Sequence, residues 1–145
     1  MVIILFTLLI SINTSIFSEI KKETDVKDSE IIIVIYQSAG ACVKCYFQPM
    51  EIIQNVMKNL HNKDKIKMLA FVQCQRKKEL SVFKKLYDWK YNMLMDNNNI
   101  REKMGIDLNS AITVFNSEGK IIFNITDKEF AGADKKLYDV LSKTL

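Results

Sequence analysis

The chain of 145 residues has the length of one domain with a single hydrophobic core. Its composition, with 48% hydrophobic and 26% charged residues, is ordinary for a globular protein. The net charge of +4 comes from 21 basic and 17 acidic residues that are interspersed along the chain. No basic block alternates with aromatic residues, which excludes the usual pattern of a nucleic-acid-binding surface.

The first 18 residues contain no charged side chain, and Val2–Ile12 is an almost unbroken apolar run. Such a run suits the apolar region of a signal peptide and falls short of the ~20 residues that a membrane span needs. We therefore expect a signal peptide or membrane anchor in residues 1–18, a polar linker in 19–29 and a folded domain in 30–145. A buried N-terminal strand or helix is the alternative.

This division of the chain predicts that the domain lies outside the cytoplasmic membrane. It would be periplasmic or secreted, either free or tethered by the N-terminal segment.

Hydrophobic periodicity predicts the first elements of the domain in chain order. A continuous, β-branched apolar run over residues 31–36 is typical of a strand buried on both faces. Apolar residues at helical spacing predict a helix over residues 42–60, and a second strand follows over 65–74. An amphipathic helix is expected over residues 76–91, with these side chains pointing inward: Leu80, Phe83, Leu86 and Tyr87.

The last third of the chain predicts a short helix, a hairpin and a final helix. The short helix lies within residues 97–106 and ends at Gly105. Strands over residues 111–115 and 120–124 flank the turn sequence NSEG, which is a hairpin signal. The final helix carries Leu137, Val140 and Leu141. The resulting order of elements is β-α-β-α-β-β-α, which is an α/β pattern.

This order places the cysteines at one edge of the predicted sheet, by which we mean the edge formed by the carboxyl ends of its parallel strands. A right-handed crossover makes the first two strands parallel, and catalytic groups in such sheets lie beyond the carboxyl ends of the strands. Cys42 follows the end of the first strand and opens a helix, and Cys74 ends the second strand. We therefore expect Cys42, Cys45 and Cys74 along the same edge.

The sequence SAGACVKC, residues 38–45, favours redox chemistry at its two cysteines. Cysteines at positions i and i+3 share a helix face within disulfide reach. Unpaired N–H groups and the dipole at a helix start favour the thiolate of Cys42, and the positive charge of Lys44 lies nearby. Cys45, one turn deeper, is the expected resolving thiol. A permanent disulfide is the alternative, but so small a ring closes little chain entropy and would stabilise the fold poorly.

A zinc site is a weaker interpretation of the same residues. Cys42, Cys45, Cys74 and His61 would nominally make a Cys₃His set. However, His61 lies 19 residues along the chain from Cys42, which corresponds to ~28 Å of helix. We therefore expect no metal site here and a solvated His61 at a helix end.

With these elements the chain resembles the thioredoxin superfamily, and its exported TlpA/ResA-like or redoxin-like thiol–disulfide oxidoreductases in particular. The stretches that carry the resemblance are IIIVIYQSAGACVKC, MLAFVQCQRKKEL and LMDNNNIREKMGIDLNSAITVFNSEGKII. The resemblance covers roughly residues 30–145. It implies a thioredoxin-like α/β fold, in which a central mixed sheet carries helices on both faces.

The resemblance also implies catalysis by Cys42 and Cys45, without a cofactor. The substrates would be protein thiols and disulfides, and a membrane-embedded thiol transporter would be the electron donor. No nucleic-acid partner is expected.

The sequence departs from the family pattern in several places around the cysteine pair. Ala41 replaces the aromatic residue that usually precedes the first cysteine, and Gln48 stands where TlpA-like proteins often carry a glutamate. Tyr36 lies where many thioredoxins have a buried acid. Ser110 stands where the family places its cis-proline, whose loop presents backbone to the substrate. We therefore regard Ser110, like Lys44, as an auxiliary site residue.

Two other classes of function stay open, and so does the role of the third cysteine. A peroxiredoxin-like peroxidase would carry the motif PxxxTxxC, which the residues before Cys42 lack. A non-catalytic binding module on a thioredoxin scaffold is the second alternative, and the missing proline favours it. Cys74 is expected to be a buried thiol at a strand end, or else a third redox thiol that exchanges with Cys42 or Cys45.

Overall fold

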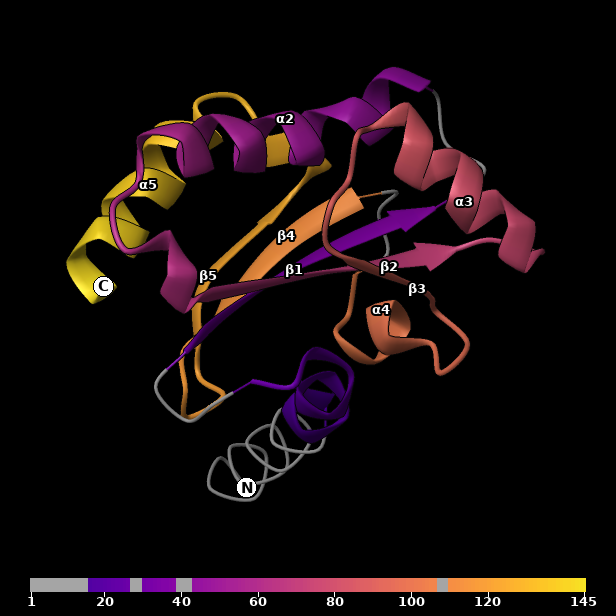
Figure 1. The fold of residues 1–145 in the computed structure, drawn as a ribbon, viewed down its shortest axis with the longest axis horizontal. Coiled ribbons are helices and arrows are strands. Elements are labelled where there is room, and N and C mark those ends of the chain that lie inside the picture. The colour runs from indigo at the N-terminus through magenta and orange to yellow at the C-terminus, as the bar shows by residue number, and fades with distance from the viewer. Residues whose placement is uncertain (1–15, 27–29, 39–42, 107–109) are drawn as a thin grey trace, which may run out of the picture.

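The computed structural model describes residues 16–26, 30–38, 43–106 and 110–145, and within these residues the chain forms a five-stranded sheet. The strand order is β3-β2-β1-β4-β5. Helices lie against both faces of the sheet, which gives three layers (Figure 1). The strands are β1 (Ile31–Ser38), β2 (Ile66–Gln73), β3 (Asn92–Met95), β4 (Ser110–Phe115) and β5 (Ile121–Thr126).

The sheet is mixed, and β1 is its central strand. β1 pairs with β2 in parallel, as the crossover rule predicts, and β2 pairs with β3 in parallel. On its other side β1 pairs with β4 antiparallel, and β4 forms the predicted hairpin with β5. The α/β class, the mixed sheet and the helices on both faces are therefore confirmed.

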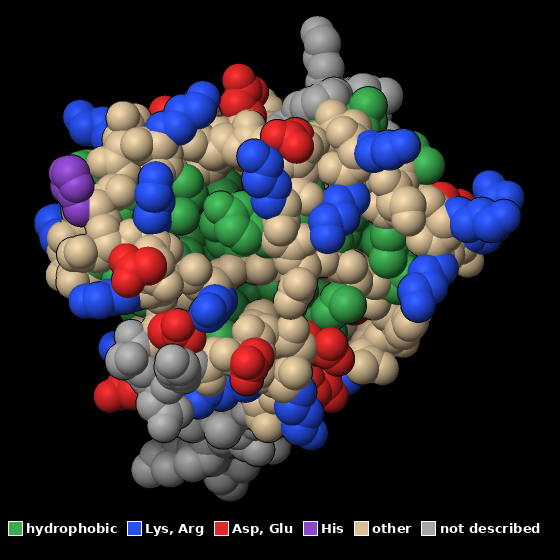
Figure 2. All heavy atoms as spheres, in the orientation of Figure 1, with side chains coloured by type: hydrophobic (Ala, Val, Ile, Leu, Met, Phe, Trp, Pro, Cys, Tyr) green, Lys and Arg blue, Asp and Glu red, His purple; other side chains and the backbone are tan. Residues whose placement is uncertain are grey.

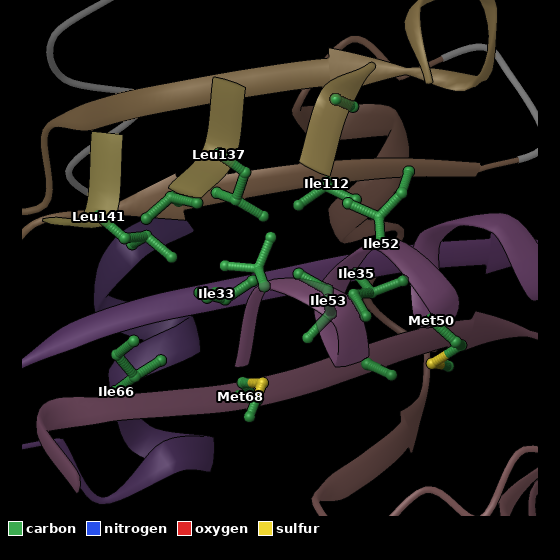
Figure 3. Packing of buried hydrophobic residues seen from close by; sticks show 14 of the residues in the cluster. Ile33, Ile35, Met50, Ile52, Ile53, Ile66, Met68, Ile112, Leu137 and Leu141 are labelled. Carbon is green, nitrogen blue, oxygen red and sulfur yellow. The ribbon is translucent and has the colours of Figure 1, made fainter. Parts of the chain in front are cut away.

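The larger core lies between the sheet and three helices, α2 (Val43–Asn59), α3 (Lys77–Leu86) and α5 (Ala133–Thr144). Alternate β1 residues, such as Ile33 and Ile35, point to this face and meet Ile53 of α2 (Figure 3). Leu137 and Leu141 of α5 close the layer one turn apart, as their spacing predicts. Burial of this apolar surface is the main contribution that holds α2 and α5 on the sheet.

The opposite face of the sheet is covered by α4 (Ile100–Lys103) and by helical residues 16–24, which we call the N-terminal helix (Figure 1). Ile16, Phe17 and Ile20 of this helix are buried against the sheet. At its polar side Glu19 lies 3.4 Å from the Lys103 ammonium of α4. The carbonyl of Glu23 accepts a hydrogen bond of 3.3 Å from the side chain of Asn92, at the start of β3.

The N-terminal helix differs from the expected polar linker over residues 19–29, because the described part of that range is helical as far as Thr24. Its buried residues recur at helical spacing, so the charged residues between them face solvent. The alternative of a buried N-terminal strand or helix concerned residues 1–18, of which only residues 16–18 are described, and these are helical. Within the described residues, no helix is both long and apolar enough to cross a membrane.

Two further differences concern the chain between α3 and α4. The strand β3 was not expected, and α3 ends at Leu86 instead of continuing to residue 91. The backbone turns at Asp88, which has a φ of +47°, and the N–H of Trp89 bonds to the carbonyl of Lys84. Tyr87 is buried as predicted, but Leu86, which was expected to point inward, is 55% exposed.

Candidate functional site

The segment between β1 and α2 carries the predicted redox pair. β1 ends at Ser38 and α2 begins at Val43, so Cys42 is the residue immediately before the helix. Cys42 itself lies outside the described residues. Cys45 is the third residue of α2, but its side chain and that of Lys44 lie outside the described part of the structure. Their proposed roles therefore stay predictions.

Ser110 lies beside the strand end that leads to this segment. It is the first residue of β4, and its partner in the sheet is Gln37, the penultimate residue of β1. Both side chains are only 1% exposed. The structure thus brings the position expected for the family's cis-proline to the end of β1. Gln37 was not singled out in the sequence, where it is one polar residue at the end of an apolar run.

Cys74 lies on the other side of β1, at the same edge of the sheet. It follows Gln73, the last residue of β2, which pairs with Ser38. Its Sγ atom donates a hydrogen bond of 3.7 Å to the carbonyl of Arg76. Burial and then the carboxylate of Glu79 raise the pKa of the Cys74 thiol, and the Arg76 backbone offsets part of this shift. A raised pKa weakens the thiol as a nucleophile. Cys74 is half-buried rather than buried as the sequence predicted, and its role stays a prediction.

A polar cluster at the carboxyl ends of β2 and β3 was not predicted. Asp96 accepts hydrogen bonds from the backbone N–H groups of Ile100, at 2.6 Å, and Arg101, at 3.1 Å. The guanidinium of Arg101 donates a bond of 2.6 Å to the side-chain oxygen of Gln73. Asp96, Arg101 and Gln73 line a pocket of about 250 Å³. The signal for this cluster in the sequence was Asp96, an acidic residue shortly before Ile100, the apolar residue at which α4 begins.

Tyr36 lies in β1, two residues before its end, and is fully buried. Burial raises the pKa of its phenol far above the ordinary value, the Asp96 carboxylate adds to the shift, and the Thr113 hydroxyl offsets part of it. The phenol therefore stays neutral at physiological pH. It does not replace the buried carboxylate that many thioredoxins have at this position, because a neutral phenol is a poor proton acceptor.

Of the nominal zinc set, Cys42 and the side chain of Cys45 lie outside the described residues, so only His61 and Cys74 can be placed. His61 is exposed after the end of α2. Among the residues that the structure describes, no three His, Cys, Asp or Glu side chains converge on one point.

No protein-family model and no curated protein matches this sequence, whereas many solved structures match its fold. One is a secreted disulfide oxidoreductase of Mycobacterium tuberculosis described as homologous to E. coli DsbE. It has a TM-score of 0.61 and 10% identity over 79% of this chain and 82% of that chain.

Two other matches have similar coverage. An uncharacterized thioredoxin-like protein from Porphyromonas gingivalis has a TM-score of 0.62 and 19% identity, over 79% of this chain and 76% of that chain. StoA from Bacillus subtilis has a TM-score of 0.57 and 13% identity, over 79% of this chain and 84% of that chain. At these identities the likeness establishes architecture, and the chain has a thioredoxin-like fold similar to that of these proteins.

Proposed function

We propose that this chain is an exported thiol–disulfide oxidoreductase that exchanges disulfides with protein substrates through Cys42 and Cys45. The observation that carries the proposal is the place of this pair in the chain. Cys42 directly precedes α2, and α2 follows the central strand of a thioredoxin-like sheet. A thiol at a helix start is favoured as the thiolate, which is the nucleophile of disulfide exchange.

The proposed reaction proceeds in two exchanges. The Cys42 thiolate attacks one sulfur of a substrate disulfide, the substrate S–S bond breaks, and the departing thiolate takes a proton. The Cys45 thiolate then attacks the Cys42 sulfur of the mixed disulfide and releases the second substrate thiol. The substrate gains two electrons, and the enzyme keeps a Cys42–Cys45 disulfide. The reverse sequence oxidises a dithiol, and the difference in reduction potential between the partners sets the direction.

Two observations support an extracytoplasmic location and a protein substrate. The sequence opens with an apolar run typical of an export signal, and one structural neighbour is described as a secreted disulfide oxidoreductase. Other neighbours are described as thiol-disulfide oxidoreductases. An exported dithiol needs a source of electrons, and a membrane-embedded thiol transporter is the donor that we propose.

Reduction of insulin disulfides by the purified protein tests the proposal. Cys42→Ser should abolish the reaction, and Cys45→Ser should accumulate mixed disulfides that are visible on a non-reducing gel. Cys74→Ser is the matched control and should keep the wild-type rate. The assigned roles are wrong if Cys45→Ser releases substrate as fast as the wild type. Consumption of hydrogen peroxide without insulin reduction would instead indicate a peroxidase.

A further inference from the structure

A groove lies at the amino ends of β2 and β3, away from the edge that carries the cysteines. It has a volume of about 400 Å³, which lies within the range of small-molecule sites. Its walls come from the C-terminal half of α2, from Lys63 and from the segment between α3 and β3. The hydrogen bond from the side chain of Gln54 to the carbonyl of Tyr87, at 3.3 Å, joins two of these walls.

The floor of the groove is apolar and aromatic. Ile53 and Trp89 are almost fully buried beneath it, and Met57 lies beside them. The Trp89 indole is held in place, because its N–H donates a bond of 3.3 Å to the carbonyl of Asn92. Tyr91 packs edge-on against Trp89, with ring centres 5.1 Å apart, and is 40% exposed. A rigid aromatic wall of this kind favours a planar or branched apolar group.

The rim of the groove is positively charged. Lys58, Lys63 and Lys90 line it, and Asp88 is the single acidic residue among the lining side chains. Asp88 lies 3.7 Å from the Lys90 ammonium, so its charge is offset within the rim. Among the described residues, neither Lys58 nor Lys63 has a carboxylate partner within salt-bridge distance. Figure 2 shows hydrophobic side chains near the centre of the face in view, with Lys and Arg as well as Asp and Glu side chains around them.

We propose that this groove binds a small organic anion, with its aromatic or branched apolar body against Tyr91, above the buried Trp89 in the floor, and its carboxylate between Lys58 and Lys63. The apolar floor contributes affinity and the two unpaired ammonium groups select the charge. The site is distinct from the proposed redox site, because β2 extends for eight residues, or ~26 Å, between the two edges of the sheet. The groove therefore adds a binding function that does not depend on the cysteines.

Trp89 makes the test specific, because it is the only tryptophan in the chain and forms the floor of the groove. The probe is 3-phenylpropanoate, and the matched neutral probe is its amide, 3-phenylpropanamide. Titration of the full chain with the anion should change the Trp89 emission in a saturable way. The amide should bind at least about threefold more weakly, since each exposed ion pair contributes a modest amount. Added salt should weaken only the anion.

Charge variants locate the site. Lys58→Gln combined with Lys63→Gln should reduce the affinity for the anion to that for the amide, whereas both Lys→Arg changes should preserve it. Lys120→Gln combined with Lys143→Gln removes the same charge from exposed positions that do not line the groove, and should leave the affinity unchanged. Melting curves of all variants verify that they are folded.

Four results would overturn the proposal. The first is a Trp89 emission that does not respond to the anion, and the second is equal binding of the anion and the amide. The third is an equal loss of affinity in the two pairs of Lys→Gln variants. Binding of an acidic peptide, but not of 3-phenylpropanoate, would assign the groove to a polypeptide and would also overturn it.

Discussion

The ring of Phe17 packs against Gly119, in the turn between β4 and β5. Gly119 has a φ of +81°, and a Cβ atom at this position would lie 2.7 Å from the Cγ atom of Phe17. The Phe17 ring also lies 5.5 Å from that of Phe115, and the Lys21 ammonium lies 5.6 Å from its centre. Phe17, in the N-terminal helix, thus packs against the β4–β5 hairpin, which follows it by about 100 residues in the sequence.

Gly119→Ala should destabilise the protein by about 2 kcal/mol or more. An alanine in the left-handed region costs roughly 1–2 kcal/mol, and the contact with Phe17 adds to this cost. Urea unfolding measures the change. Gly132→Ala is the control, because Gly132 has a φ of +69° and no atom within 4 Å of the position of a Cβ. Gly132→Ala should lose only the part of the stability that the left-handed backbone conformation costs an alanine. Equal losses in the two variants would show that Phe17 does not press on the turn.

Ile20→Ala should lower the free energy of unfolding by about 2–4 kcal/mol, because the side chain is fully buried under the sheet. Lys22→Ala lies on the exposed side of the same helix and should change the stability by less than about 0.5 kcal/mol. Chemical denaturation of the full chain compares the two variants. If neither substitution matters, residues 19–24 behave in solution as part of the polar linker that the sequence predicted over residues 19–29.

Ser110→Pro should alter the rate of insulin reduction more than the stability. Proline is tolerated at the first residue of a strand, and Ser110 opens β4 opposite Gln37 at the edge where β1 ends. The measurements are the reduction rate per folded molecule and the melting temperature. Ala111→Pro, one residue further into the same strand, is the control and should unfold the protein. A sharp fall in melting temperature with an unaltered rate of insulin reduction would show that Ser110 does not lie near the reactive cysteines.

Glu79→Gln should lower the pKa of Cys74, because the Glu79 carboxylate is one cause of its upward shift. In a Cys42→Ser/Cys45→Ser background Cys74 is the only thiol, so its rate of alkylation against pH reports this pKa directly. The variant should react faster near neutral pH. Glu118→Gln, in the hairpin turn, is the matched control and should leave the profile unchanged. If Glu79→Gln and its parent show the same dependence of alkylation rate on pH, burial alone raises the pKa of Cys74.

The same shift has a consequence for stability. The folded chain retains the Cys74 proton to a higher pH than the unfolded chain does. This contribution to stability is therefore present below the thiol pKa of the unfolded chain, and is lost as the pH rises through the folded value. Unfolding of the Cys42→Ser/Cys45→Ser protein against pH should show this decline, and Glu79→Gln should reduce it.

The elements that could be predicted from the sequence are those with long apolar patterns. The β-branched run at Ile31 is typical of a buried strand, and the spacing of apolar residues in α2 and α5 indicates their inward faces. The strand β3 was missed because its four residues, NMLM, contain no β-branched side chain and follow no clear alternation. Its place is set by pairing with β2, which is a tertiary effect.

The N-terminal helix was hidden by a stronger competing pattern. The apolar run before it is typical of an export signal, so the charged residues that follow were interpreted as a linker. However, Ile16, Phe17, Ile20 and Thr24 recur at helical spacing, and all four are buried. This periodicity was the available signal.

Only those residues of the candidate site whose positions follow from the ends of strands could be predicted from the sequence. The parallel crossover places Cys74 at the edge where β1 ends, and the hairpin brings Ser110 to the same edge. In contrast, the contact between Arg101 and Gln73 depends on β3 and on the turn that follows it. No local pattern indicates that these two residues meet.

The central position of β1 affects how the chain can fold during its synthesis. Ile33 pairs with Met68 on one side and with Val114 on the other, so one edge of the most apolar strand stays open until most of the chain has been made. Such long-range pairing is slow, and an exposed strand edge invites aggregation. A nascent chain of this topology therefore exposes an open strand edge until β4 has been made. For the export that we propose, the same delay would be useful, since an unclosed sheet leaves the polypeptide unfolded enough to pass through a translocation pore.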